Sequence, residues 1–372
     1  MGLKNALMKK ITCIAVLTAV TMQSFAITGN DSAISIAAAS DKKNAKYYIV
    51  KEDKSYLKPK TFTLSAAGDV TLSSDIKQPA SVNFFSVYNN QTPEYFFKGV
   101  KKVFAKDDLT LVNCEGTLSN RGSRANKQWA FRGKPSYVNI LKKGSIEAVS
   151  FANNHTRDYG EISYKDTMSI LKKAKIAYAT ESKVTIKKVN GIKVGLVAIT
   201  SVGATCEPVS RLKKLMKDVK KKKAEVIIVS MHSGIEGTQT ISAIQTKLSH
   251  TAIDMGADLV IGHHPHVMQK ISRYKGSYIL YSTGNFCFGG NTNPKDKDTF
   301  IFQQTFVVKN GKLVKKKNAK VIPCRLSGKD YVNNYQPVIC KGSQKKRIIS
   351  RLNSYSSSVK IDSKGMIKDV KK

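Results

Sequence analysis

Five short apolar runs in the sequence are each followed by side chains that can bind a metal ion. The runs are Phe62–Ala67, Leu109–Asn113, Ile146–Phe151, Glu225–Met231 and Leu259–Ile261. Each has the length of a buried β-strand, and segments with helical spacing lie between them, which is the pattern of an α/β fold. Because ligands of open α/β sheets bind beyond the carboxyl ends of the strands, we expect these five ends to build one site.

The polar residues at these ends form a mixed oxygen and nitrogen donor set. They are Asp69, Asn113, Glu115, Asn153, Asn154, His155, His232, His263, His264 and His266. A single histidine at a strand end is usually structural, but burying this many carboxylates and imidazoles without a cation is costly. The set therefore predicts a site for a divalent metal ion, Mn, Fe, Zn or Mg, with no thiolate ligand.

Side chains alternate along extended backbone, and this bears on three residues of the set. His264 and His266 are two residues apart, so on an extended segment both face the same side and can serve one metal centre. Cys114 lies between Asn113 and Glu115, so on a strand it points away from both. We expect Cys114 to be a core thiol rather than a metal ligand.

The remaining pattern predicts helices and a second, partly antiparallel sheet. Helical spacing occurs in Pro93–Lys106, Ile162–Lys173, Pro208–Lys223 and Ile241–Met255, with a last helix around Ser343–Asn353. Hairpin turns are expected at Asn190-Gly191, Lys275-Gly276 and Asn310-Gly311.

The N-terminus has the features of a secretory signal. Three lysines precede the apolar stretch Ile11–Val20, and Ser24-Phe25-Ala26 fits the small-x-small cleavage rule. An uncleaved anchor is the alternative, although the apolar stretch is short for a membrane span. We expect a signal at 1–26, a flexible spacer at 27–60, one folded domain at 61–340, and a helix with a Lys- and Ser-rich tail at 341–372.

The chain is strongly basic, with 63 Lys and Arg against 26 Asp and Glu, a net charge of +37. Loss of residues 1–26 removes three lysines and no acid, which leaves 37 − 3 = +34. This charge favours polyanionic surroundings, but a Lys-rich solvated surface explains scattered lysines equally well. The five cysteines that follow the signal are widely spaced and odd in number, so free buried thiols are expected; a Cys324–Cys340 pair is left open.

The order of the short motifs resembles one known family. Five motifs follow one another along the chain: Ala67-Gly68-Asp69-Val70, Asn113-Cys114-Glu115-Gly116, the Asn153-Asn154-His155 block with Asp158-Tyr159-Gly160, Gly262-His263-His264-Pro265-His266 and Gly284-Asn285-Phe286. Together they resemble the CapA/PgsA family of capsule and poly-γ-glutamate synthesis proteins, over roughly 61–338. The resemblance implies a metallophosphatase-like α/β fold: a two-sheet β-sandwich flanked by helices, in four layers (αββα).

The resemblance also implies roles for single residues. The implied metal ligands are Asp69, Glu115, Asn154, His232, His264 and His266. His155 and His263 are implied as catalytic residues, with His155 as the proton donor. The residues assigned to substrate binding are Asn113, Asn153 and Asn285. Arg132 is a further candidate, for binding an anionic group of the substrate; the alternative is a solvated surface arginine.

Two positions depart from the expected patterns. Thr71 stands where a phosphoesterase has a ligand histidine, which the CapA-type pattern lacks, and this weakens one metal position and a two-metal phosphatase mechanism. Ser233 stands where the family tends to have an aromatic residue, a change expected to open the site or to alter substrate stacking. The first hypothesis is an exported, cell-surface, metal-dependent protein that makes, releases or anchors an anionic capsule polymer such as poly-γ-glutamate. Its expected partners are that polymer, the cell envelope and membrane-bound capsule synthesis proteins, with no nucleic acid. A surface metallophosphoesterase and a non-catalytic polyanion-binding assembly protein are the alternatives.

Overall fold

The chain divides into two compact units, Met1–Pro59 and Lys60–Lys372. The structure, a computed structural model, describes residues 23–28, 33–39, 46–52, 58–203 and 207–370. The first unit contains a three-stranded antiparallel sheet in the order β1 (Gln23–Thr28), β2 (Ala33–Ala39), β3 (Lys46–Glu52). These strands lie in the stretch where we expected the end of a signal and a spacer. Residues 1–22, the body of the expected signal, lie outside the described residues.

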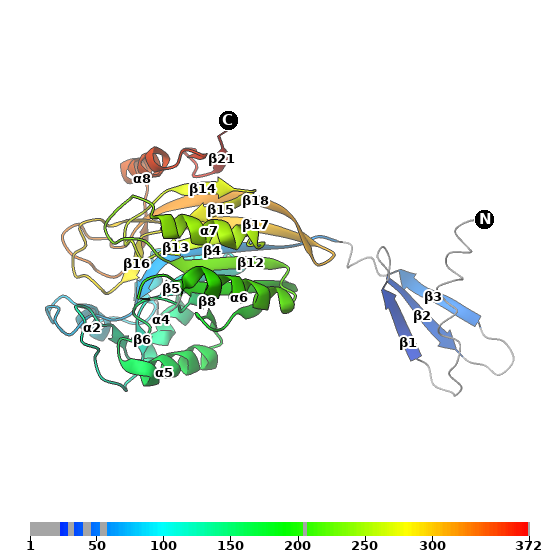
Figure 1. The fold of residues 1–372 in the computed structure, drawn as a ribbon, viewed down its shortest axis with the longest axis horizontal. Helices are drawn as coiled ribbons and strands as arrows, with labels where there is room; N and C mark the ends of the chain where they lie inside the picture. Colours follow the sequence, from blue (N-terminus) through cyan, green and yellow to red (C-terminus); the bar gives the residue numbers. More distant parts are fainter. Residues whose placement is uncertain (1–22, 29–32, 40–45, 53–57, 204–206, 371–372) are drawn as a thin grey trace. The chain divides into compact units, whose positions relative to one another are not determined.

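Two large sheets form the second unit (Figure 1). One has six strands in the order β10 (Thr185–Val189), β11 (Ile192–Thr200), β12 (Val226–His232), β13 (Leu259–His263), β15 (Ser277–Leu280), β14 (Ile271–Tyr274). The other has eight, in the order β19 (Val338–Ile339), β18 (Lys312–Arg325), β17 (Asp298–Lys309), β4 (Lys60–Thr71), β5 (Leu109–Cys114), β8 (Ala148–Ser150), β9 (Ala177–Ala179), with β16 (Asn285–Phe288) also paired to β4.

Three buried apolar clusters hold these elements together. One cluster takes side chains from both sheets, including Leu64 and Phe302 from the larger sheet and Leu196 and Ile228 from the smaller. A second packs the smaller sheet against α6 (Pro208–Lys221) and α7 (Ala243–Asp254). The third packs the larger sheet against four helices, α2 (Phe84–Asn89), α3 (Lys101–Phe104), α4 (Val138–Lys143) and α5 (Gly160–Lys173).

Helix α6 shows how the sequence directs this packing. Its buried residues recur with helical spacing, at Val209, Leu212, Leu215, Met216 and Val219. The side chain of Glu207 accepts hydrogen bonds from two backbone N–H groups of the first turn, and Pro208 occupies the first helical position. Lysines end the helix, where their charge suits the negative end of the dipole.

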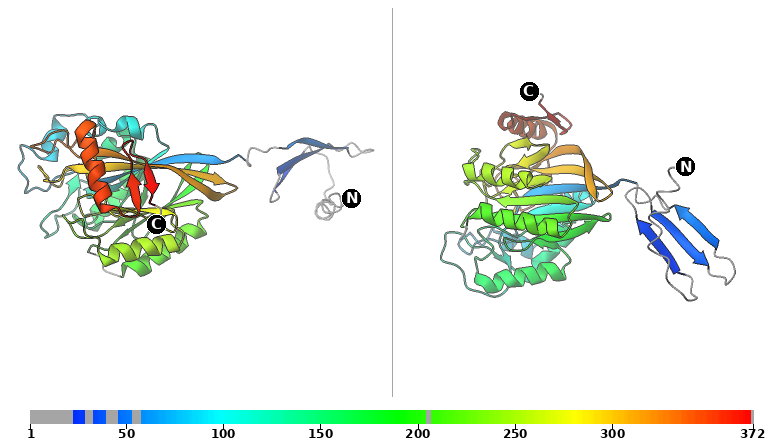
Figure 2. Two further views of the ribbon diagram at one scale, coloured as in Figure 1. Left: turned by 90° about the horizontal axis from the view of Figure 1, so that it is seen from above. Right: turned by 45° about the vertical axis from the view of Figure 1, so that its right-hand side comes forward.

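The C-terminal segment is folded rather than an extended tail. Helix α8 (Gly342–Tyr355) is followed by a small hairpin of β20 (Val359–Ile361) and β21 (Ile367–Asp369). Figure 2 shows the helix and hairpin beside one another. The side chain of Asn353 ties them together, since its amide donates to the carbonyl of Ile361 and its oxygen accepts from the Ile361 N–H.

Most of the expected elements are present, and the mixed α/β class is confirmed. The three expected hairpins occur at β10–β11, β14–β15 and β17–β18. The helix expected at Pro93–Lys106 is wrong: the segment holds only the 3-10 turn η2 (Tyr95–Phe97) and the single turn α3. Gly99 separates them because the chain passes close by; a Cβ atom there would lie 2.4 Å from the Pro337 carbonyl oxygen.

The topology brings the ends of several strands to one edge of the unit. Strands β4, β5 and β8 are parallel in the larger sheet, as are β11, β12 and β13 in the smaller. Asp69 pairs in register with Asn113 and with Asn285, and His232 pairs with His263. The polar residues singled out in the sequence therefore collect at this edge.

A close backbone approach beside Asp69 requires glycine. A Cβ atom at Gly68 would lie 1.8 Å from the Gly284 carbonyl oxygen, which accepts the backbone N–H of Asp69. Gly68→Ala is therefore expected to lower the free energy of unfolding by about 3 kcal/mol, measured by denaturant titration. Gly328→Ala is the control, because its nearest neighbour, Val338 Cγ1, would lie at an ordinary 3.4 Å. Equal stability of the two variants would contradict the close approach.

Candidate metal centre

Two carboxylates form the floor of the site. Asp69 lies near the end of β4, and Glu115 follows β5; both are completely buried. Asp69 Oδ1 accepts a hydrogen bond from Asn113 Nδ2 (2.9 Å), and Oδ2 accepts one from the His264 backbone N–H (3.3 Å). Among the described residues, nothing donates a hydrogen bond to either oxygen of Glu115. A buried carboxylate without donors normally binds a cation.

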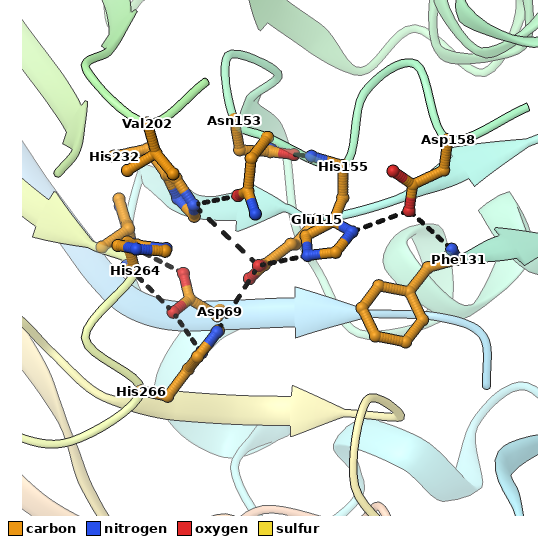
Figure 3. A network of polar contacts seen from close by, with 12 residues as sticks. Asp69, Glu115, Phe131, Asn153, His155, Asp158, Val202, His232, His264 and His266 are labelled. Atoms are coloured by element: carbon orange, nitrogen blue, oxygen red, sulfur yellow. Dashed lines mark hydrogen bonds and ion pairs between the residues drawn. The ribbon is translucent and has the colours of Figure 1, made fainter. Parts of the chain in front are cut away.

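Three imidazoles surround the Glu115 carboxylate, as Figure 3 shows. Its Oε1 lies 3.7 Å from His266 Nε2, 3.8 Å from His155 Nε2 and 3.9 Å from His232 Nε2. These histidines come from three different parts of the chain, beyond β13, beyond β8 and at the end of β12. The strand-end pattern of the sequence thus predicts the convergence correctly.

His266 is the residue that joins the two carboxylates. Its Nδ1 lies 3.3 Å from Asp69 Oδ2 and 2.8 Å from Asn285 Oδ1. Burial would lower the pKa of His266, but the charges of Glu115 and Asp69 outweigh this and raise it to about 10. Burial likewise acts to raise the pKa of Asp69, but contacts with His263 and His266 hold it well below its ordinary value.

The backbone around the last two histidines differs from our expectation. His264 and His266 have φ of 97° and 57°, so the segment is a turn with left-handed residues and not extended chain. The ring centroids of the two histidines are nevertheless only 5.9 Å apart. The alternation argument for this pair is therefore wrong, although both residues lie at the site.

His232 and His264 differ from His266 in charge state. Burial, followed by the nearby His264, holds the pKa of His232 well below its usual value. Burial and His266 lower the pKa of His264 to about 4. Both rings are therefore neutral near pH 7, the form in which imidazole binds metals. His232 Nε2 also lies 2.8 Å from Asn154 Oδ1, which brings this expected amide ligand to the cluster.

His155 has a second, polar environment on its other nitrogen. Nδ1 lies 2.7 Å from Asp158 Oδ2, whose carboxylate also accepts the Phe131 N–H (2.7 Å) and the Lys127 ammonium (2.8 Å, through Oδ1). The Phe131 ring packs against the imidazole with centroids 4.6 Å apart. Burial lowers the pKa of His155, while Asp158 opposes this shift. Asp158 therefore orients His155 so that Nε2 faces Glu115.

The remaining expected site residues differ in the contacts that they make. His263 is buried, with Nδ1 3.2 Å from Asp69 Oδ1. Asn153 donates to Asn113 Oδ1 (3.1 Å) and to the Cys114 carbonyl (2.8 Å), so the two asparagines brace the strand ends. Arg132 instead donates to the carbonyls of Arg121 and Gly122 and lies over the Tyr159 ring, 4.0 Å from its centroid.

Glu236, which lies in the loop after β12, is not among the residues expected from the sequence. One oxygen of this exposed carboxylate and one nitrogen each of His264 and His266 lie within 4.8 Å of one another. Asp69, Glu115 and His266 form a second such group. Glu236 follows no apolar strand directly, so only the spacing from His232 could have indicated it.

The donor atoms present at this site fit a divalent metal ion. The fit rests on the donor-free oxygens of Glu115 and on His264 Nδ1, which is buried and without a hydrogen-bond partner among the described residues. A metal would be held by Asp69, Glu115 and His266, with Asn154, His232 and His264 within the same cluster. Carboxylate and imidazole donors suit the expected metals.

Metal binding is expected to release protons and to become tighter as the pH rises. Because the pKa of His266 is raised to about 10 without metal, its ring is protonated at neutral pH and the metal must displace that proton. Each displaced proton raises the apparent affinity about tenfold per pH unit below this pKa. Calorimetric titrations between pH 6 and 8, in two buffers of different ionisation enthalpy, measure both effects. An affinity that is constant over this range would contradict the protonation state.

Comparison with known proteins identifies relatives of the folded domain. A family model described as "Bacterial capsule synthesis protein PGA_cap" matches residues 63–290. The chain belongs to this family. The match contains every expected site residue, from Asp69 to Asn285, and confirms the resemblance inferred from the motifs.

Three curated relatives share the region. The capsule biosynthesis protein CapA of Bacillus anthracis is 29% identical over 63% of this chain and 62% of its own length. The PGA biosynthesis protein CapA of Bacillus subtilis (strain 168) is 28% identical over 58% of this chain and 62% of its own. A probable polyglutamine synthesis accessory protein of Mycobacterium tuberculosis is 26% identical over 59% and 66%. The chain thus matches about three-fifths of the length of the first two relatives.

Two further observations concern the cysteines and the helices. Cys114, Cys287, Cys324 and Cys340 are buried free thiols, and no disulfide joins Cys324 to Cys340. Within the part of the chain that the structure describes, no helix is both long and apolar enough to cross a membrane.

Proposed function

We propose that this protein acts in the synthesis, release or anchoring of an anionic capsule polymer such as poly-γ-glutamate, by metal-assisted hydrolysis or transfer. Family membership and the names of the relatives support the polymer class. The family resemblance and the cluster of metal-binding side chains support the reaction class.

One observation carries the proposed chemistry: the Glu115 carboxylate is completely buried, lacks hydrogen-bond donors among the described residues, and faces three imidazole nitrogens within 3.9 Å. A purely structural carboxylate would have accepted hydrogen bonds from nearby N–H groups, as Asp158 does from the Phe131 N–H. A divalent ion held by Glu115 and its neighbours would satisfy the carboxylate and would explain why the imidazoles converge on it.

The side chains present supply the other parts of a hydrolytic or transfer reaction. A bound divalent ion would polarise an acyl or phosphoryl oxygen and lower the pKa of a water molecule. His155, held through Nδ1 by Asp158, presents Nε2 at the site and can give a proton to the leaving group. His263, with Nδ1 3.2 Å from Asp69 Oδ1, would orient that carboxylate.

We further propose that the fold is the metallophosphatase-like sandwich of two sheets with helices on both outer faces. The shared apolar cluster of the two sheets, with α6 and α7 on one side and α2 to α5 on the other, supports this arrangement. Thr71 disfavours a two-metal phosphoesterase, because its buried hydroxyl stands where such an enzyme has a ligand histidine.

The test of the proposed function combines metal analysis with a substrate panel. Purified protein is analysed for bound Mn, Fe, Zn and Mg, and is then incubated with poly-γ-glutamate and with phosphodiesters. We expect a stoichiometric metal and cleavage or transfer of the polyamide. Preferred turnover of phosphodiesters would favour the phosphoesterase, and metal without any turnover would favour the non-catalytic assembly protein.

Export is the remaining part of the proposal. Lys4, Lys9 and Lys10, the apolar stretch 11–20 and the small residues at 24–26 support a location outside the cytoplasmic membrane, together with envelope-bound capsule synthesis proteins. Trypsin added to intact cells after wall removal should digest the protein. Full protection, with a cytosolic control also intact, would contradict export.

A further inference from the structure

A second polar site lies where α8 meets the start of β17 and the end of β18. It is a pocket of about 430 Å³, and every residue that lines it is charged. Five of these residues are cationic and three are acidic: Lys295, Lys297, Arg325, Arg347 and Arg351, with Asp296, Asp298 and Asp330. We call it the charged pocket. None of its residues belongs to the candidate metal centre.

One half of the charged pocket is a fixed network that fastens α8 to the sheet. Arg347 binds Asp298 through both terminal nitrogens, with Nη2 2.6 Å from Oδ1. Arg351 Nη1 lies 2.9 Å from Asp296 Oδ1 and 2.9 Å from Asp298 Oδ2. Each guanidinium of this half is thus matched by carboxylates of the protein, so these four residues explain the attachment of the helix.

The other half holds positive charge that the protein itself matches poorly. The Lys297 ammonium is buried (8% residue exposure) and donates to two neutral oxygens, Asn293 Oδ1 at 2.6 Å and the Pro294 carbonyl at 2.8 Å. Among the described residues no carboxylate forms an ion pair with it. Burial, and then the charge of Arg325, lower the pKa of Lys297. A buried ammonium beside a guanidinium is costly unless an anion joins them.

Arg325 has one exchangeable partner. Its side chain is 11% exposed and pairs with Asp330, Nη1 to Oδ1 at 2.7 Å, whereas the Asp330 side chain is 69% exposed. Exposed ion pairs contribute little free energy, so this carboxylate can leave at small cost. Asp330 therefore occupies the position that a carboxylate from outside would take, next to the unmatched Lys297.

We propose that the charged pocket binds a carboxylate of the polymer, with Arg325 and Lys297 as donors and Asp330 as the group that it displaces. The identity of the polymer rests on the proposed function. The planar fork of a guanidinium matches a carboxylate, and a chain with one carboxylate per repeat presents many of them.

The pocket is connected to the metal centre by a short stretch of chain. Phe288 packs its ring 4.9 Å from that of His266, and Lys295 of the charged pocket follows seven residues later. Seven residues span at most about 25 Å. Asn333 Nδ2 fixes this stretch by donating to the carbonyls of Phe288 and Asn291. A polymer can therefore reach both sites at once.

The proposal is tested by the binding of a fluorescent γ-glutamate oligomer, followed by anisotropy at low salt. Arg325→Gln is expected to weaken binding about tenfold, the effect of one lost charge-assisted hydrogen bond. Lys297→Gln should act in the same direction. Asp330→Asn should instead tighten binding by about threefold or more, because it removes the competing carboxylate.

The controls change the same charges in a pair outside the pocket. Lys275→Gln and Asp254→Asn alter a surface ion pair of 2.5 Å, and both should stay within about twofold of the wild-type affinity. Equal effects at the two locations, or weaker binding by Asp330→Asn, would overturn the proposal. Tighter competition by polyphosphate than by the γ-glutamate oligomer would overturn the carboxylate assignment. Melting temperatures identify any variant that fails to fold. If Lys297→Gln is one of these, the test rests on Arg325→Gln and Asp330→Asn.

Metal content and turnover are measured on the same preparations. If the wild type shows no turnover but its binding depends on Arg325 and Asp330, the proposed catalysis is contradicted and the proposed pocket is supported. If the wild type turns over the polymer but binding does not depend on either residue, the catalysis is supported and the pocket is contradicted.

Discussion

His266→Ala is expected to remove most of the bound metal and to lower the melting temperature by several degrees. The imidazole lies within 3.7 Å of both Asp69 and Glu115, so its loss takes away a ligand and leaves two buried carboxylates without their shared counter-charge. Loss of a ligand should weaken metal binding by about 100-fold or more. A metal present at 100 times its dissociation constant stabilises the fold by about 2.7 kcal/mol, and this contribution disappears with it.

The matched control is His250→Ala. His250 stacks on Tyr274, with ring centroids 3.9 Å apart, and lies outside the cluster. Metal content by mass spectrometry and melting temperature with and without added metal are compared for both variants. The assignment fails if His266→Ala and His250→Ala retain the same amount of metal.

His155→Ala is expected to keep most of the metal and to lose turnover by about 10²–10⁴-fold, the usual contribution of a general acid. His155 Nε2 lies 3.8 Å from Glu115 Oε1, while Nδ1 is held by Asp158. The family resemblance assigns this ring to proton donation rather than to the metal, and the variant tests that assignment. Turnover, metal content and melting temperature are measured on one preparation.

Two companion variants separate the roles around His155. Asn154→Ala should loosen the metal, because Asn154 Oδ1 contacts His232 at the cluster. Asp158→Asn should lower turnover with little change in metal content, since it weakens the contacts of this side chain with His155 and Lys127 and leaves the metal-binding side chains in place. An unchanged rate in a well-folded His155→Ala protein would show that His155 has a structural role only.

The placement of the site could be predicted because it depends on strand ends. Asp69, Glu115 and His232 each end or follow an apolar run, and parallel strands bring such ends together whatever the details of packing. The same reasoning placed His264 and His266 at the site but with the wrong backbone. Their left-handed φ values depend on the turn after β13, which a two-residue spacing does not encode.

Other residues depend on tertiary contacts that the sequence does not encode. The guanidinium of Arg132, the candidate for an anionic group, donates to two carbonyls of a neighbouring loop. Glu236 was missed because it reaches the cluster from a loop without a periodic pattern. The charged pocket joins residues from 295 to 351, and only the packing of α8 on the sheet brings them together.

The position of β4 limits the order in which the chain can fold. It is the first strand of the second unit, but it lies in the middle of its sheet between β5 and β17, and β17 begins only at Asp298. During translation, β4 thus cannot complete its pairing with β17 until about residue 309 has left the ribosome. Pairings this distant in sequence form slowly, because a long loop must close before they are gained. Asp69 is therefore made early, but the last of its metal-binding partners, His266, is made almost 200 residues later, and β17 must still pair with β4 after that.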